Sequence, residues 1–235
     1  SPPHPAAPHL LSSPGSVRLL ALPGRPLALP LVAGGGNQGA ILVWDLQHPD
    51  APVTLGRHDN AVNDLAWSAD GQLLASCDNQ GAIRLWQAAT RTETGALWGH
   101  RGWISSLTFV GPGRLLASGG YDGTVCVWDT EAHAVRQVLR ECEGPVRDLA
   151  ATCDGQYLAA VSEKGNLVVW NTATWRAEAN VTGLGNELFS VAIAPDTSFL
   201  AAGTGAGEIL RVAWKDLVDG PPGRAASAGE KPEAK

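Results

Sequence analysis

The stretch YDGTVCVWDT, residues 121–130, joins a turn-forming Asp-Gly pair to an alternating segment that ends on Trp128 and Asp129. Asp-Gly is a strong turn signal, and alternation of side chains between two faces is typical of a β-strand. The tryptophan follows Gly123 by five residues. The stretch therefore predicts a hairpin turn followed by a strand that ends on a large aromatic side chain.

The same arrangement recurs through the chain at a fixed spacing of 42 residues. Glycine precedes tryptophan by five residues in four pairs: Gly39–Trp44, Gly81–Trp86, Gly123–Trp128 and Gly165–Trp170. One more step of 42 residues reaches Val212, with Gly207 five residues before it. A second, aliphatic landmark keeps the same step: Val62, Ile104, Val146 and Leu188. A period of this length predicts the blades of a β-propeller.

One repeat, residues 100–141, contains four short extended segments separated by Gly, Pro and Asp, the usual punctuation of strands. In its third segment Val125 and Val127 share one face, while Cys126 and Trp128 share the other. A single sheet that is apolar on both faces must stack against neighbours. The sequence therefore predicts an all-β fold: a β-propeller of four-stranded antiparallel blades, with about five repeats of 42 residues, forming a whole ring or part of a larger one.

The clearest repeat resembles the WD-repeat β-propeller family. The resemblance rests on the following residues: Gly99-His100, Ser118, Asp122 and Trp128-Asp129. It implies that His100, Ser118, Asp122 and Trp128 form a buried, hydrogen-bonded structural tetrad, which would satisfy polar groups that are costly to bury alone. The resemblance covers residues 16–217. It implies the fold rather than a particular function, because this fold serves many tasks.

The other repeats depart from this pattern. The preceding repeat keeps His58, Ser76 and Trp86 but has Gln80 at the position of the aspartate, and we expect Gln80 to take over its hydrogen bonds. The following repeat keeps only Trp170, and the last repeat keeps none of the four. Loss of a whole polar set is compatible with folding, because removal of both partners of a hydrogen bond costs little.

The chain divides into three predicted segments. Residues 1–15 are predicted to be a flexible proline-rich arm, residues 16–217 to be the WD-repeat blades, and residues 218–235 to be a disordered tail. The resembled family usually closes its ring with more blades than these five. We favour a portion of a larger propeller or of a multidomain protein. An intact five-bladed ring, or an open ring that a partner or a missing segment completes, remains an alternative.

Composition excludes several classes of function. The net charge is −6 and no basic cluster occurs, which argues against direct binding of nucleic acid. No run of about 20 apolar residues is present, so no membrane-spanning helix is predicted. The four cysteines, at positions 77, 126, 142 and 153, lack metal-ligand spacing. We expect reduced thiols in a cytoplasmic or nuclear protein, with neither a metal nor a cofactor.

The sequence also lacks the short motifs of nucleophilic, zinc-dependent and phosphate-transferring enzymes. Asp64 and Asp148 occupy equivalent positions of two repeats, where Ser106 and Ser190 occur in the others. That variation suits a strand position better than a pair of catalytic carboxylates. The protein is therefore predicted not to be an enzyme.

Candidate partner-binding residues come from loops at the top face of the propeller, around its central channel. The resemblance implies that two positions per repeat face the channel mouth, one directly after the aliphatic landmark and one seven residues before the tryptophan. The residues selected from these positions are Asn63, Ser105, Arg147 and Phe189, and Asn79, Tyr121 and Glu163. Trp103 is added as an exposed aromatic anchor, with packing between blades as its alternative role.

These features favour a non-enzymatic scaffold or adaptor. Its top face would bind a peptide or protein partner and help to assemble a complex, because aromatic and arginine side chains dominate the energy of such contacts. The alternative is a regulatory or sensor domain of a larger multidomain protein, whose catalytic module lies outside this chain.

Overall fold

A computed structural model of the chain describes residues 17–21, 31–184 and 187–218. Five antiparallel sheets follow one another along the sequence. The first sheet contains β1 (Val17–Ala21), β2 (Leu31–Gly36), β3 (Ala40–Asp45) and β4 (His48–Arg57). The second contains β5 (Val62–Trp67), β6 (Leu73–Asp78), β7 (Ala82–Gln87) and β8 (Thr92–Trp98). The third contains β9 (Ile104–Val110), β10 (Leu115–Gly120), β11 (Val125–Asp129) and β12 (Ala134–Leu139).

The fourth sheet contains β13 (Val146–Ala151), β14 (Tyr157–Ser162), β15 (Leu167–Asn171) and β16 (Arg176–Val181). The fifth contains β17 (Leu188–Ile193), β18 (Phe199–Thr204) and β19 (Ile209–Ala213). It has three strands instead of the predicted four, because the described chain turns into the short helix α1 (Trp214–Val218) directly after β19. Leu217 of this helix is buried against the fourth and fifth sheets.

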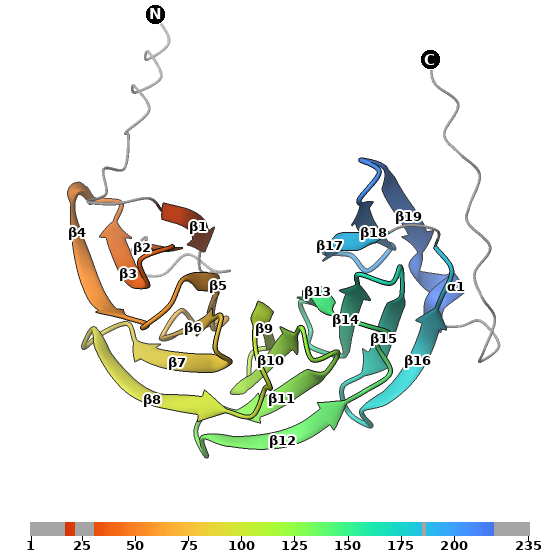
Figure 1. Cartoon of the computed structure of the whole chain (residues 1–235), viewed down its shortest axis with the longest axis horizontal. Coiled ribbons are helices and arrows are strands. Elements are labelled where there is room, and N and C mark those ends of the chain that lie inside the picture. Colours follow the sequence, from red (N-terminus) through yellow and green to blue (C-terminus); the bar gives the residue numbers. More distant parts are fainter. Residues whose placement is uncertain (1–16, 22–30, 185–186, 219–235) are drawn as a thin grey trace, which may run out of the picture.

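The sheets stand side by side around a common centre, as propeller blades do, and form an open arc (Figure 1). Strands β5, β9, β13 and β17 lie on the inside of the arc, and β4, β8, β12 and β16 lie on the outside (Figure 1). The first and fifth sheets are the two ends of the arc and do not meet (Figure 1). The predicted all-β propeller of antiparallel blades is thus confirmed, and the described part of it is an unclosed ring.

The core lies between the sheets, where Trp86, Trp128 and Trp170 each pack on the preceding blade. Trp86 shares a buried cluster with Ile41 and Val43 of the first sheet. Trp170 likewise shares one with Val125 and Val127 of the third sheet. The alternation seen in the sequence therefore serves stacking, because both faces of a blade find an apolar neighbour.

Hydrogen bonds also connect the inner strands of successive blades. Asp64 of β5 accepts a hydrogen bond from the backbone amide of Leu107 at 2.7 Å, and Asp148 of β13 accepts one from that of Val191 at 2.8 Å. Ser106 Oγ donates to Asp148 Oδ1 at 2.9 Å. Burial raises the pKa of Asp64 to about 6 and also raises the pKa of Asp148. These two carboxylates join blades to one another.

The fifth sheet leaves one face without a neighbour among the described residues. Ile209 of β19 is 76% exposed, whereas Leu167, its equivalent one repeat earlier, is fully buried. On the same strand the guanidinium carbon of Arg211 lies 4.3 Å from the ring centroid of Phe199. This face corresponds to the one that contacts the next blade elsewhere in the arc.

Stacking between blades predicts a large difference between two leucine substitutions. Leu158→Ala removes a fully buried side chain between the third and fourth sheets, and should lower the free energy of unfolding by about 2–5 kcal/mol. Leu46→Ala, at an exposed turn position, should change it by about 0.5 kcal/mol or less. Urea unfolding of both variants measures the difference, and similar losses would contradict a core formed between blades.

Candidate functional site

The tetrad residues of the third blade form one chain of hydrogen bonds. Trp128 of β11 donates from Nε1 to the Ser118 hydroxyl of β10 at 2.7 Å. His100, between β8 and β9, places Nε2 2.7 Å from the same hydroxyl and Nδ1 3.1 Å from Asp122 Oδ2. Asp122 lies in the turn between β10 and β11. These hydrogen bonds therefore connect the segment between β8 and β9 to strands β10 and β11 of the third blade and to the turn between them.

Asp122 receives more donors than the histidine alone. Its carboxylate also accepts hydrogen bonds from the backbone amides of Arg101, at 2.9 Å, and Thr124, at 3.0 Å, and from the Thr124 hydroxyl at 2.7 Å. Burial by itself raises the pKa of Asp122, but these donors and His100 outweigh it and hold the pKa well below its usual range. Asp122 is therefore a fully satisfied carboxylate.

His100 is the positive partner in this pair. Burial lowers the pKa of its imidazole, but the hydrogen bond to Asp122, the neighbouring Cys126 and the charge of Asp122 together raise the pKa to about 9. A protonated His100 donates from both ring nitrogens, to Asp122 and to Ser118. The tetrad of the third blade thus contains a partly buried ion pair at neutral pH.

The second blade contains a related chain with a different acid. His58 Nε2 lies 2.7 Å from the Ser76 hydroxyl, which also accepts a hydrogen bond from Trp86 Nε1 at 2.8 Å. His58 Nδ1 lies 3.2 Å from Asp78 Oδ2. Gln80, in contrast, is exposed, and its backbone amide donates to Asp78 Oδ1 at 2.9 Å. The expectation that Gln80 replaces the aspartate was therefore wrong.

Asp78 takes this role because of the direction in which its side chain points from the end of β6. Gly120 of the third blade is the equivalent of Asp78, and a Cβ atom at Gly120 would lie 2.5 Å from His100 Nδ1. A side chain at this position therefore points directly at the histidine. In this second blade burial is the largest effect and lowers the pKa of His58.

The fourth blade satisfies its tryptophan in a third way. Trp170 Nε1 donates to Glu141 Oε2 at 3.1 Å. Glu141 precedes the sequence equivalent of His100, which is Cys142, by one residue. Comparison of the repeats at an offset of 42 residues therefore identifies Cys142 and misses Glu141. The carboxylate next to Cys142 was the sequence feature that could have indicated this acceptor.

Four of the predicted partner-binding residues meet in one aromatic–arginine cluster: Trp103, Tyr121, Arg147 and Phe189. The rings of Trp103 and Tyr121 have centroids 5.3 Å apart. The guanidinium carbon of Arg147 lies 5.4 Å from the Tyr121 centroid and 4.6 Å from that of Phe189, and Arg147 Nη1 donates to the Tyr121 hydroxyl. Trp103, Tyr121 and Phe189 are 52%, 37% and 40% exposed, so the cluster forms a surface.

The other predicted residues lie elsewhere. Asn63 Nδ2 donates to the backbone carbonyl of Ile104 at 2.8 Å, and the Ser105 hydroxyl lies 2.6 Å from the carbonyl of Val146. Both side chains therefore connect one blade to the next. Asn79 and Glu163 lie in the turns that correspond to that of Tyr121, in the second and fourth blades. They are half-buried and lie outside the cluster's ring and guanidinium contacts.

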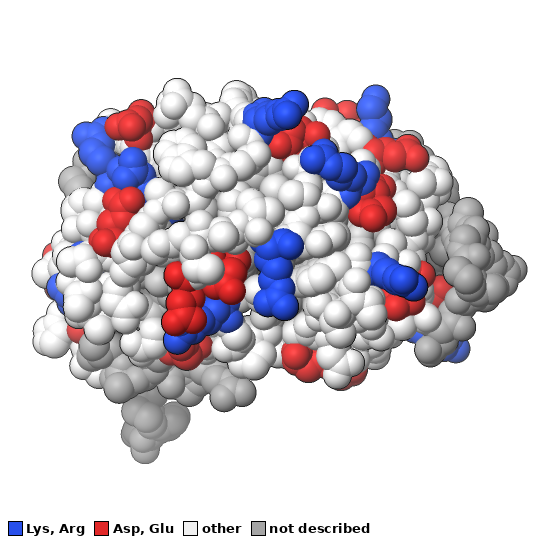
Figure 2. Space-filling view, turned by 90° about the horizontal axis from the view of Figure 1, so that it is seen from below, with Lys and Arg blue, Asp and Glu red and all other residues white. Residues whose placement is uncertain are grey.

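Metal binding, membrane spanning and nucleic-acid binding would each require recognisable features in the described residues. They contain no group of three or more His, Cys, Asp or Glu side chains arranged to hold a metal ion. None of the helices in this part of the chain is long and apolar enough to cross a membrane. The face shown in Figure 2 mixes acidic and basic side chains among many uncharged ones. That face carries no broad basic patch of the kind that nucleic acids require.

Antiparallel blades with a Trp–Ser–His–Asp chain define a WD-type propeller. The family described as WD domain, G-beta repeat matches residues 52–87, 91–129 and 135–171. The chain belongs to this WD-repeat family. Each match begins in or just before the outer strand of one blade and ends in the third strand of the next. No curated protein matches the chain. Propellers of this family generally serve as non-catalytic domains that mediate contacts between proteins.

The reassigned acid of the second blade gives a test by substitution. Asp78→Ala leaves His58 and two backbone amides without their acceptor, and should lower the free energy of unfolding by about 1–3 kcal/mol. Gln80→Ala, two residues away, should change it by about 0.5 kcal/mol or less, because its side chain is exposed. If urea unfolding shows equal losses of unfolding free energy for the two variants, the assignment of the acid to Asp78 is contradicted.

The raised pKa of His100 predicts a pH dependence. The folded pKa of about 9 exceeds the ordinary histidine pKa of 6.5, so the stabilisation is complete below pH 6.5 and is lost as the pH rises through 9. The change for this residue is at most roughly 3 kcal/mol. Unfolding free energies at pH 6.5 and 9.5 should differ less in His100→Gln than in wild type. The exposed His133→Gln is the control, and an unchanged slope in His100→Gln would refute the ion pair.

Proposed function

We propose that this protein is a non-enzymatic interaction scaffold or adaptor that binds a peptide or another protein at the top face of its blades and helps to assemble a complex. The top face is the one that carries the connection between β8 and β9 and the turn between β10 and β11. The aromatic–arginine cluster of Trp103, Tyr121, Arg147 and Phe189 is the observation that carries this proposal.

The cluster has the composition and rigidity of a binding hot spot. Trp, Tyr and Arg are the residues most enriched among the side chains that dominate binding energy. Arg147 contacts two aromatic rings, so its guanidinium is already ordered before a partner arrives. An ordered arginine loses less conformational entropy on binding, which favours affinity. Asn79 and Glu163, in the flanking blades, would supply a polar rim.

The other charged groups of the described chain support a role in binding rather than catalysis. His58 and His100 belong to structural hydrogen-bond chains, and Asp64 and Asp148 are tied to the backbone of the next blade. We therefore expect neither a cofactor nor a metal, and no direct contact with nucleic acid or membrane. All four cysteines are free thiols, which supports a cytoplasmic or nuclear location.

The open end of the arc supports a second contact. The exposed face around Ile209 corresponds to a face that is covered in the inner blades. We propose that a partner protein or a further segment of chain covers it and continues the ring. The top face would serve equally in a sensor domain attached to a catalytic module.

Substitution of the cluster tests the top-face proposal. Trp103→Ala and Arg147→Ala should each reduce recovery of the bound partner in affinity purification by about tenfold or more, because each removes a hot-spot side chain. Trp98→Ala and Arg176→Ala are matched controls, since both residues are exposed and lie outside the cluster. Unchanged recovery with both cluster variants, or equal losses with the controls, would discard the proposal.

A further inference from the structure

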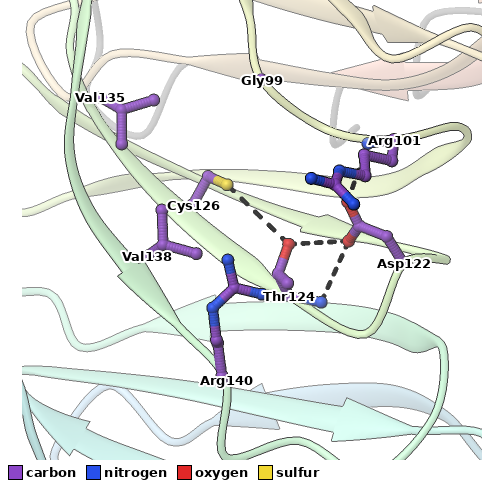
Figure 3. Close-up of a pocket in the computed structure, with 8 residues that line it drawn as sticks. All are labelled: Gly99, Arg101, Asp122, Thr124, Cys126, Val135, Val138 and Arg140. Carbon is purple, nitrogen blue, oxygen red and sulfur yellow. Dashed lines mark hydrogen bonds between the residues drawn. The ribbon is translucent and has the colours of Figure 1, made fainter.

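A cavity of about 230 Å³ lies between the connection from β8 to β9 and the outer strand of the third blade. Eight residues line it: Gly99, Arg101, Asp122, Thr124, Cys126, Val135, Val138 and Arg140. Figure 3 shows Arg101 and Arg140 approaching the region of Thr124 from different segments of the chain. Val135 and Val138 of β12 form an apolar side of the cavity (Figure 3).

The guanidinium groups of Arg101 and Arg140 are available to bind an anionic ligand. Within the described part of the chain, neither Arg101 nor Arg140 has a side-chain ion pair. The one carboxylate of the lining, Asp122, already accepts hydrogen bonds from His100, Thr124 and two backbone amides. Because Asp122 forms a neutral pair with protonated His100, the cavity retains a net charge of about +2 from the two guanidinium groups.

Glu141, which is adjacent to Arg140 in the sequence, is also engaged in hydrogen bonds. It accepts hydrogen bonds from the backbone amide of Arg140 and from Trp170 Nε1 of the fourth blade. Its carboxylate therefore serves the tryptophan of the next blade. Sequence reasoning did not single out Arg101 and Arg140, because they lie 39 positions apart and outside the tetrad.

The size and chemistry of the cavity fit a phosphate group on a short aliphatic stem. A phosphate monoester carries a charge of about −1.5 to −2 at neutral pH, and two guanidinium groups bind its oxygens through charge-assisted hydrogen bonds. The valines would contact the carbon atoms of the stem. The lining contains no aromatic ring on which a nucleotide base could stack. A phosphorylated side chain therefore fits this lining better than a nucleotide.

We propose that the cavity between Arg101 and Arg140 binds the phosphate group of a phosphorylated serine or threonine in a partner protein. The site adjoins the aromatic–arginine cluster, because Arg101 precedes Trp103 by two residues and Asp122 follows Tyr121. The backbone amide of Tyr121 also donates to the carbonyl of Trp103 at 2.8 Å. A peptide that contacts the cluster can thus reach the cavity with a neighbouring side chain.

The inference extends the proposed function but is tested separately from it, with small ligands that do not need the cluster. N-acetyl-phosphothreonine-N-methylamide is titrated into the full chain, and binding is followed by two-dimensional amide NMR, which also reports folding. Arg101→Gln and Arg140→Gln should each weaken binding by about tenfold or more, as expected for loss of a charged hydrogen-bond donor. Arg136→Gln, an exposed arginine of β12 outside the lining, is the matched control and should change binding by about twofold or less.

Competing ligands separate the sources of the anion. The glutamate analogue of the same compound should bind about tenfold or more weakly, since it offers a single carboxylate charge. Inositol 1-phosphate, which represents a lipid headgroup, should bind no more tightly than the phosphothreonine compound. The proposal is overturned by an absence of saturable binding, by equal losses with Arg136→Gln, by equal affinity for the glutamate analogue, or by tighter binding of inositol phosphate.

Discussion

Face-to-face packing between sheets is the constraint on which the rest of this structure depends. A blade such as β9 to β12 is apolar on both faces, with Val127 on one and Trp128 on the other, and both side chains are fully buried or nearly so. Neither face is suited to water, so a blade gains its stability by stacking on its neighbours. The tetrad lies within this packed layer, where its hydrogen bonds are shielded from water and an unpaired member would be costly.

The same requirement explains why the repeats differ without losing the fold. A buried indole N–H must find an acceptor, but the acceptor need not be the same residue in every blade. Trp86 and Trp128 donate to Ser76 and Ser118, whereas Trp170 donates to Glu141 from the connection between blades. The hydrogen bond is kept while the residue that accepts it changes.

The repeat period and the alternation of apolar residues were sufficient to predict the architecture, because stacked copies of one template repeat both in the sequence. The period and the alternation did not predict which side chains form the hydrogen bonds inside each blade, because that depends on side-chain length and direction. Asp78 substitutes for the tetrad acid from a position two residues before Gln80, and Glu141 acts from one residue before the equivalent of His100. A fixed offset in the sequence compares equivalent backbone positions. Whether Asp78 or Glu141 reaches its hydrogen-bond partner depends instead on the direction and length of the side chain. The helix after β19, in place of a fourth strand, also breaks the period.

One repeat position connects the core to the surface. The residue after the aliphatic landmark contacts the next blade: the short Ser105 hydrogen-bonds to its backbone, whereas the long Arg147 packs its guanidinium on Phe189. The aromatic–arginine cluster therefore keeps its geometry only while the inner strands keep their spacing. The hydrogen bond from the Val191 amide to Asp148 fixes β17 beside β13, and thereby sets Phe189 against Arg147. The half-buried carboxylate of Asp148 thus helps to set the geometry of the exposed aromatic–arginine cluster, because the same two strands carry both.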